Sequence, residues 1–173
     1  MKFSVGFLLC SLCIALEDVH ATSFGRTGAG TIVSIDNKPA ICLPDKTEQG
    51  FPVGWISLSE SYELNPSSWG VYLRSGFKPL ELKSGDCIVY DVIPEGYGLG
   101  NYNIKGRSLI LKVNHTYVFG LSSAYNPTDT YSAAFCISES ADGSRQFIQY
   151  SPMPNGSDFI PSCDGRRNGS ASE

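Results

Sequence analysis

The stretch TYSAAFCISESADGSRQFIQY, Thr130 to Tyr150, decides the fold class. Its two arms, TYSAAFCIS and RQFIQY, contain the aromatic and β-branched residues that favour strands. Between them, Ala141-Asp142-Gly143-Ser144 carries the Asp-Gly dipeptide, a strong turn signal. The stretch therefore predicts a β-hairpin.

Earlier segments repeat this pattern of short apolar runs broken by turn residues. The run VGWISLSE alternates with a period of two, which predicts Val53 and Trp55 on one face of a strand and Ile56 and Leu58 on the other. SLILKV and TYVFGLS, separated by Asn114-His115, predict a second hairpin. No segment of a dozen residues shows the helical period with caps. We therefore expect an all-β fold, an antiparallel β-sandwich of immunoglobulin-like or similar type.

The N-terminus has the pattern of a secretory signal peptide. Lys2 precedes an apolar run, FSVGFLLCSLCIAL, and a short polar segment then ends in Val19-His20-Ala21. This pattern predicts export and cleavage after Ala21, and the run is too short for a comfortable membrane span. Leucines stand directly before both cysteines of the run, where a lipoprotein site needs a small residue, so we expect no lipid anchor. We expect a signal peptide at 1–21, the β-sandwich domain at 22–150 and an irregular tail at 151–173.

Cleavage after Ala21 leaves four cysteines in the mature chain: Cys42, Cys87, Cys136 and Cys163. An even number of cysteines in an exported protein favours a disulfide framework, and four cysteines allow three pairings. A zinc site needs closely spaced Cys or His ligands, and these cysteines are far apart and have no histidine neighbour. We expect disulfides, no metal site and no cofactor.

Charge and motifs exclude several classes of function. The formal net charge is −4, and the only basic pair is Arg166-Arg167, so the chain lacks the basic patch that nucleic-acid binding requires. His115 is the only histidine after Ala21, it lies in an expected turn, and no GxSxG motif accompanies it. We therefore expect no enzymatic activity. A hydrolase that pairs His115 with a serine stays as an alternative.

Aromatic residues in loops are the best candidates for binding a partner. Most aromatic side chains are expected in the core and in cross-strand pairs, whereas loops position side chains for recognition. The glycine-, asparagine- and proline-rich segments Gly96 to Lys105 and Ala124 to Thr130 are expected to be such loops. The predicted contact residues are Tyr97, Tyr102, Asn103, Tyr125 and Asp129.

The order of four motifs resembles a known family. NKPAICLPDKTEQG, PLELKSGDCIVYD, LKVNHTYVFGL and YSAAFCISESADGSRQFIQY follow one another from about Thr31 to Tyr150. This order is similar to that of small exported enterobacterial proteins described as type VI secretion immunity proteins, mostly periplasmic lipoproteins. The chain departs from them in lacking a lipoprotein cleavage site and in having Ser84 and Asp91 where the family tends to have Pro and Gly.

The resemblance implies a periplasmic β-sandwich that binds and neutralises a toxin delivered by a neighbouring cell. It carries over no catalytic residue. It implies a structural Cys87 paired with Cys42, because both stand at matching points of the family pattern. Cys136 would then pair with Cys163 or remain free. The expected partner is thus a cognate effector toxin, a protein.

Two further alternatives stay open. A carbohydrate- or small-ligand-binding module, adhesin-like, would stack its aromatic side chains on a sugar, and an apolar cleft lined by the loop tyrosines would favour it. The sequons at Asn114, Asn155 and Asn168 are compatible with a glycosylated secreted protein.

Overall fold

Short strands, rather than helices, form all the regular structure that the computed structural model describes. The described residues are 25–47, 49–61, 64, 66–100, 109–152 and 158–159. Their strands are β1 (Thr27–Ala29), β2 (Thr31–Ile35), β3 (Lys38–Cys42), β4 (Phe51–Glu60), β5 (Ser68–Leu73), β6 (Leu80–Leu82), β7 (Cys87–Val89), β8 (Tyr97–Leu99), β9 (Thr116–Ser123), β10 (Thr130–Glu139), β11 (Arg145–Gln149), β12 (Ser151–Pro152) and β13 (Asp158–Phe159).

The larger sheet has the order β1-β10-β9-β4-β5-β8. Along one edge of β10, β1 pairs with its first residues and β11 with its last ones. In the same way, β6 and β5 follow one another along one edge of β4. All these pairings are antiparallel except that of β1 with β10.

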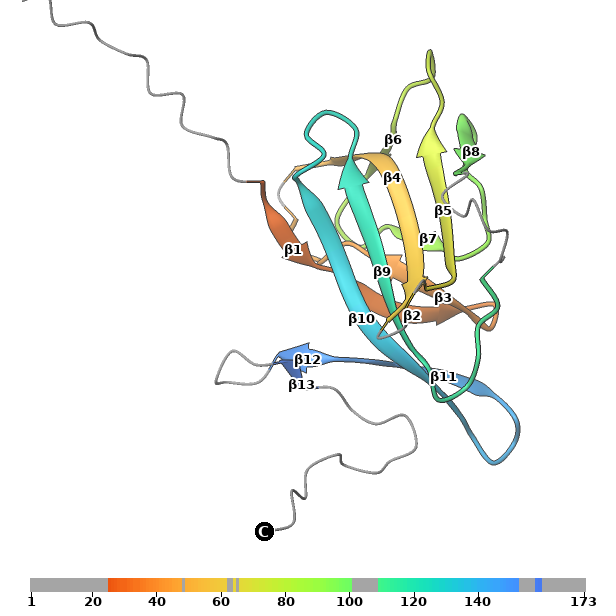
Figure 1. The fold of residues 1–173 in the computed structure, drawn as a ribbon. Coiled ribbons are helices and arrows are strands. Elements are labelled where there is room, and N and C mark those ends of the chain that lie inside the picture. Colours follow the sequence, from red (N-terminus) through yellow and green to blue (C-terminus); the bar gives the residue numbers. More distant parts are fainter. Residues whose placement is uncertain are drawn as a thin grey trace, which may run out of the picture.

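The smaller sheet, in the order β2-β3-β7, lies behind the larger one and crosses its strands steeply (Figure 1). The inward faces of the two sheets enclose the core. In β9, alternate residues are buried, and Tyr117 and Phe119 are fully so. From the smaller sheet, Ile41 and Ile88 enter the same cluster. The expectation of an all-β sandwich with mostly antiparallel strands is confirmed.

A bulge in β4 changes which residues face the core. The register against β9 shifts between Val53 and Trp55, so Val53 shares the buried face with Ile56 and Leu58. The strict alternation expected for this run placed Val53 with Trp55, and that expectation is wrong. An extra residue in one strand reverses the side-chain alternation beyond it. A pattern with a period of two therefore fails at this point.

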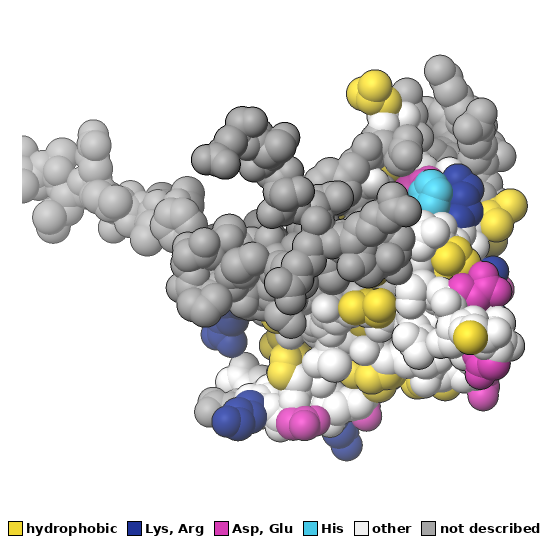
Figure 2. All heavy atoms as spheres, turned by 90° about the horizontal axis from the view of Figure 1, so that it is seen from below, with side chains coloured by type: hydrophobic (Ala, Val, Ile, Leu, Met, Phe, Trp, Pro, Cys, Tyr) yellow, Lys and Arg dark blue, Asp and Glu magenta, His cyan; other side chains and the backbone are white. Residues whose placement is uncertain are grey.

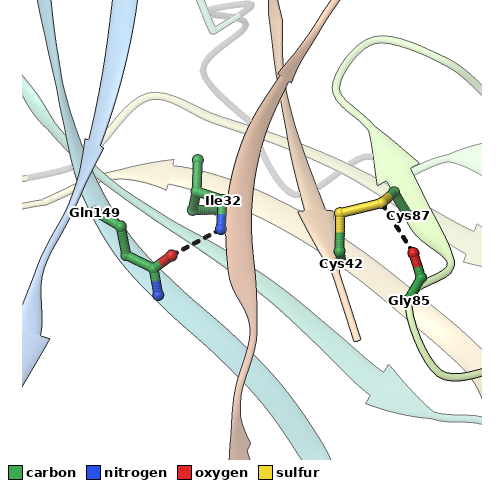
Figure 3. Close-up of a disulfide and its surroundings, with 5 residues drawn as sticks. All are labelled: Ile32, Cys42, Gly85, Cys87 and Gln149. Atoms are coloured by element: carbon green, nitrogen blue, oxygen red, sulfur yellow. Dashed lines mark hydrogen bonds between the residues drawn. A yellow bond between two sulfur atoms is a disulfide. The ribbon is translucent and has the colours of Figure 1, made fainter. Parts of the chain in front are cut away.

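Two cross-links close the sandwich (Figure 3). The side chain of Gln149 in β11 accepts a hydrogen bond from the Ile32 amide at 2.7 Å and donates one to the Gly30 carbonyl at 2.8 Å. One amide side chain thus satisfies backbone groups at the start of β2, in place of a neighbouring strand. On the other side of the smaller sheet, a disulfide joins Cys42 to Cys87, which are directly opposite in β3 and β7.

The Cys42–Cys87 pairing confirms the bond implied by the family resemblance. The sulfur of Cys87 lies 3.3 Å from the Gly85 carbonyl oxygen. Because a disulfide sulfur carries no hydrogen, this is a close contact rather than a donated hydrogen bond. Cys136 is disulfide-bonded too. Cys163, its expected partner, lies outside the described residues.

The hairpin predicted from Thr130 to Tyr150 is confirmed as β10 and β11. Glu139 faces Arg145 across the turn, where Gly143 has a φ of +82°. Asp142 accepts hydrogen bonds from the Ser144 amide at 3.0 Å and the Ser144 hydroxyl at 2.7 Å. These bonds lower the pKa of the Asp142 carboxyl, because they favour its charged form.

The hairpin predicted around Asn114-His115 is wrong. Leu109 and Leu111 are buried and Ile110 is 73% exposed, yet residues 109–112 form no strand. Their backbone groups bond to tyrosine hydroxyls instead: Tyr90 donates to the Leu109 carbonyl, and the Lys112 amide donates to Tyr117, both at 2.8 Å. The alternating apolar residues at 109–111 thus reflect alternating burial in a segment that does not pair with another strand.

Both ends of the domain contain pairings that the sequence did not reveal. Thr27–Ala29 precedes the segments that were expected to form strands, yet it forms β1 and pairs with β10. Within the tail expected to be irregular, Ser151–Pro152 pairs with Asp158–Phe159. The expected signal peptide, residues 1–21, lies outside the described residues. In the part of the chain that the structure describes, no helix has the length and apolar character needed to cross a membrane.

Candidate functional site

Tyr97, the first predicted contact residue, is buried rather than displayed on a loop. It lies in β8, and only 2% of its surface is exposed. Its hydroxyl donates to the Val53 carbonyl at 2.5 Å and accepts from the Leu80 amide at 3.1 Å. Burial raises the pKa of this hydroxyl above its usual range. The prediction of a partner contact is therefore wrong for Tyr97, because the tyrosine joins β8 to β4 and β6.

The other four predicted contact residues divide into two pairs. Tyr102 and Asn103 lie outside the described residues. Tyr125 and Asp129 lie in the loop between β9 and β10, where Tyr125 is 74% exposed. Both line a groove of about 610 Å³ at this end of the sandwich, which we call the loop groove.

The first wall of the loop groove comes from the loop between β3 and β4. It contributes Lys46, Thr47, Gln49 and Gly50. This loop starts directly after the disulfide, where the Leu43 amide donates to the Asp86 carbonyl at 3.0 Å and the Gly85 amide to the Leu43 carbonyl at 3.2 Å. The Ser84 hydroxyl donates to the Pro44 carbonyl at 2.9 Å, and the Thr47 amide donates to that hydroxyl at 3.2 Å. The wall is thus attached to the turn that precedes Cys87.

The second wall is the loop between β9 and β10, which contributes Ser123, Tyr125, Asn126 and Asp129. The Asp129 amide donates to the Asn126 carbonyl at 2.8 Å, which closes a turn around Pro127. The Asp129 carboxylate accepts from the Arg26 amide at 2.7 Å and from the Asn126 side chain at 3.0 Å. The segment before β1 is therefore part of this wall, and Asp129 holds it there.

Apolar side chains complete the lining between the walls. Phe51, Pro52 and Tyr131 line the groove, and the rings of Phe51 and Tyr131 meet edge to face at 5.0 Å. The β4 bulge brings this end of β4 against the second wall, where the Ala124 amide donates to the Pro52 carbonyl at 2.8 Å. Gly54 makes this approach possible, since a Cβ there would lie 2.6 Å from the Ala124 Cα. Aromatic surface and polar side chains in one concave site are typical of recognition.

Sequence reasoning missed most of the groove. Neither Arg26 nor Lys46 was among the predicted contact residues. Both become lining residues only because distant segments pair, β1 with β10 and β4 with β9. The signal available in the sequence was the proline-containing loop expected from Ala124 to Thr130, which contributes Tyr125 and Asp129 to the groove.

His115, the candidate base of the hydrolase alternative, lies beside a buried carboxylate. Its Nδ1 is 2.5 Å from Oε1 of Glu60, which is only 7% exposed, and Nζ of Lys112 is 3.6 Å from the same oxygen. Figure 2 shows the cyan histidine against a dark-blue and a magenta side chain. His115 and Lys112 thus both approach the same oxygen of the buried Glu60 carboxylate, and the hydrolase alternative gains no further support from these contacts.

No metal site is apparent: the described residues contain no cluster of three or more histidine, cysteine, aspartate or glutamate side chains placed to hold an ion. Comparison with known proteins gives no family model, no curated protein and no solved structure that matches the chain. The loop groove is therefore the candidate functional site.

Proposed function

We propose that the protein is an exported, non-enzymatic binding protein that recognises its partner through the loop groove. The observation that carries this proposal is the position of Tyr125, which is 74% exposed at the edge of a groove whose two walls are both held by backbone hydrogen bonds. An exposed aromatic side chain on a rigid loop buries a large apolar area at little entropic cost when it binds. Preorganised walls reduce that cost further.

The partner that we propose is a protein toxin delivered into the periplasm, so that the chain acts as an immunity protein. The family resemblance supports this partner, and the groove offers a place for a protruding segment of the toxin. Neutralisation would follow from occlusion, because a bound sandwich domain covers the surface around the segment it holds. Neither catalysis nor a cofactor is needed for such a role.

Capture of the partner tests this function. Mature protein, residues 22–173 with a C-terminal tag, would be used to isolate proteins from its own source, and a captured toxin would be titrated calorimetrically. We expect Tyr125→Ala to weaken that complex by about tenfold or more, since aromatic anchors dominate interface energies. The matched control is Tyr72→Ala, which removes a ring that is 43% exposed and stacks on Trp55 outside the groove. Equal affinities for Tyr125→Ala and the unmodified protein would refute the groove as the binding site.

A carbohydrate or small ligand is the second candidate, and the size of the groove favours it. About 610 Å³ falls within the range of small-molecule clefts. Tyr125 and Tyr131 supply rings, and Gln49 and Asn126 supply amides that can pair with hydroxyl groups. Screening the protein against an oligosaccharide array separates the candidates. Binding of a neutral sugar that Tyr125→Ala abolishes would replace the immunity function.

A further inference from the structure

The described residues that line the loop groove carry a local charge opposite to that of the whole chain. The chain has a formal net charge of −4, whereas the charged residues among those described in the groove lining are Arg26, Lys46 and Asp129. Two cations therefore face one carboxylate. Asp45 and Glu81, although close to the first wall in the chain or in space, are not among the lining residues.

The carboxylate of Asp129 is already engaged by its own wall. One of its oxygens accepts hydrogen bonds from the Arg26 amide and the Asn126 side chain, at 2.7 and 3.0 Å. Bonds of this kind between a carboxylate and neighbouring donors are strong and fix its position. Asp129 thus shapes the wall, and this oxygen is turned toward donors of the wall itself.

The two cations, by contrast, are available. Arg26 and Lys46 are exposed, and neither side chain forms an ion pair with another described residue. They come from opposite walls, since Arg26 is held to Asp129 and Lys46 belongs to the loop after β3. An anionic group between the walls would meet a positive charge on each side. Phe51, Tyr125 and Tyr131 place apolar surface next to these charges.

We propose that the loop groove binds an acidic segment of the partner protein, in which aspartate or glutamate side chains flank an aromatic or apolar one. The carboxylates pair with Arg26 and Lys46, and the apolar side chain packs against the ring of Tyr125. This inference rests on the proposed function and specifies the partner surface. It departs from the simple expectation that an acidic chain binds a basic partner.

Two capped peptides of opposite charge test the proposal, acetyl-Gly-Glu-Trp-Glu-Trp-Glu-Gly-amide and its counterpart with lysine in place of glutamate. Each would be titrated into the isotopically labelled mature protein and followed by NMR. We expect the acidic peptide to shift the resonances of Lys46, Phe51 and Tyr125 saturably, with an affinity that falls as salt is added. The lysine peptide should leave them unchanged.

Charge-neutralising variants test whether Arg26 and Lys46 bind the acidic peptide. Arg26→Gln and Lys46→Gln should each weaken the acidic peptide by about two- to fivefold, as expected for solvent-exposed ion pairs. Arg26→Gln keeps the backbone amide that binds Asp129, so the wall should persist. Lys78→Gln is the control, because Lys78 is exposed and outside the groove lining.

The outcomes separate this inference from the proposed function. Preference for the lysine peptide, or equal binding by Lys46→Gln and Lys78→Gln, would overturn the acidic-segment proposal. If a captured toxin is then weakened by Tyr125→Ala alone, the groove remains the binding site. Saturable binding of an anionic polysaccharide such as heparin, with no response to the acidic peptide, would also overturn the proposal, because the anion would then be a glycan. If Tyr125→Ala bound both the acidic peptide and the captured toxin as tightly as the unmodified protein does, the groove would not be the binding site.

Discussion

Tyr97 connects three strands of the larger sheet through a single hydroxyl group. That hydroxyl bonds to Val53 of β4 and Leu80 of β6, while the ring is buried in β8. Removing it leaves a buried carbonyl and an amide without this partner. The cost of unsatisfied buried groups is about 1–3 kcal/mol, a large part of a typical stability.

We therefore expect Tyr97→Phe to lower the free energy of unfolding by about 1–3 kcal/mol, as measured by urea denaturation. The control is Tyr125→Phe, because the hydroxyl of Tyr125 forms no hydrogen bond with a described residue. Equal unfolding free energies for the two variants would contradict the structural role assigned to the Tyr97 hydroxyl.

Buried tyrosines also predict a loss of stability at alkaline pH. Burial is the main cause that raises the pKa values of Tyr90, Tyr97 and Tyr117 above the ordinary value of 10.0. An unfolded chain then releases these protons at lower pH than the folded protein. The stabilisation is fully present below pH about 10 and is lost as pH rises through the folded pKa values.

The unfolding free energy should therefore fall as pH rises above about 10, and Tyr97→Phe should show a shallower fall, since it lacks one of the three groups. Urea denaturation across this pH range measures both slopes. A free energy that stays constant above pH about 10 would rule out the raised pKa values.

At the scale of elements, Gly54 joins the β4 bulge to the second wall of the groove. We expect Gly54→Ala to destabilise the fold by about 1–3 kcal/mol, because its Cβ would press on the backbone of Ala124 and force the loop outward. The same displacement should weaken partner binding, which calorimetry on the folded variant would measure.

Gly143→Ala is the matched control for Gly54→Ala. Gly143 has a φ of +82°, and the nearest atom to its Cβ would be the Glu139 carboxylate at 3.8 Å. This variant should cost about 1–2 kcal/mol through backbone strain alone and leave binding intact. A binding defect as large in Gly143→Ala as in Gly54→Ala would show that loss of stability, not groove shape, explains both.

Elements with strictly local signals were predictable from the sequence. The Asp-Gly dipeptide between β10 and β11 favours the positive φ that the turn needs. The alternation of Tyr117, Phe119 and Leu121 with less buried residues predicts the strand β9. The β4 bulge was not predictable in this way, because only pairing with β9 makes the extra residue visible. The strand predicted over residues 109–112 was wrong for a related reason, because tyrosine hydroxyls bond to the backbone there in place of a neighbouring strand.

The candidate site was predictable only in part. Tyr125 lies beside a proline turn, and such a turn signals an exposed loop without knowledge of the fold. Tyr97 lies in a similar glycine-rich stretch, yet it is buried. Its burial depends on the pairing of β8 with a sheet that contains β4, β5 and β6, which the local sequence does not show. Arg26 and Lys46 meet across a groove because segments far apart in the chain are joined. Such proximity has no signature in a single sequence.

At the scale of the whole molecule, the Cys42–Cys87 disulfide links the fold to the groove. It closes a loop with a sequence separation of 45 and is followed directly by the first wall. We expect the double variant Cys42→Ala, Cys87→Ala to lose about 2–4 kcal/mol of unfolding free energy. Partner affinity should fall as well, because the bonds of Leu43 to Gly85 and Asp86 lose their anchor.

Thermal unfolding and calorimetry at a temperature where the double variant is folded measure these two effects. Undiminished partner binding by the folded double variant would show that hydrogen bonds alone keep the first wall in place.

The place of Arg26 in the second wall has a practical consequence for maturation. With cleavage after Ala21, only Thr22 to Gly25 precede the residue that lines the groove. Anything fused to that end, whether an uncleaved leader or an affinity tag, starts a few residues from the mouth of the site. If the protein is exported as proposed, we expect the precursor to bind its partner poorly and removal of the leader to expose the groove.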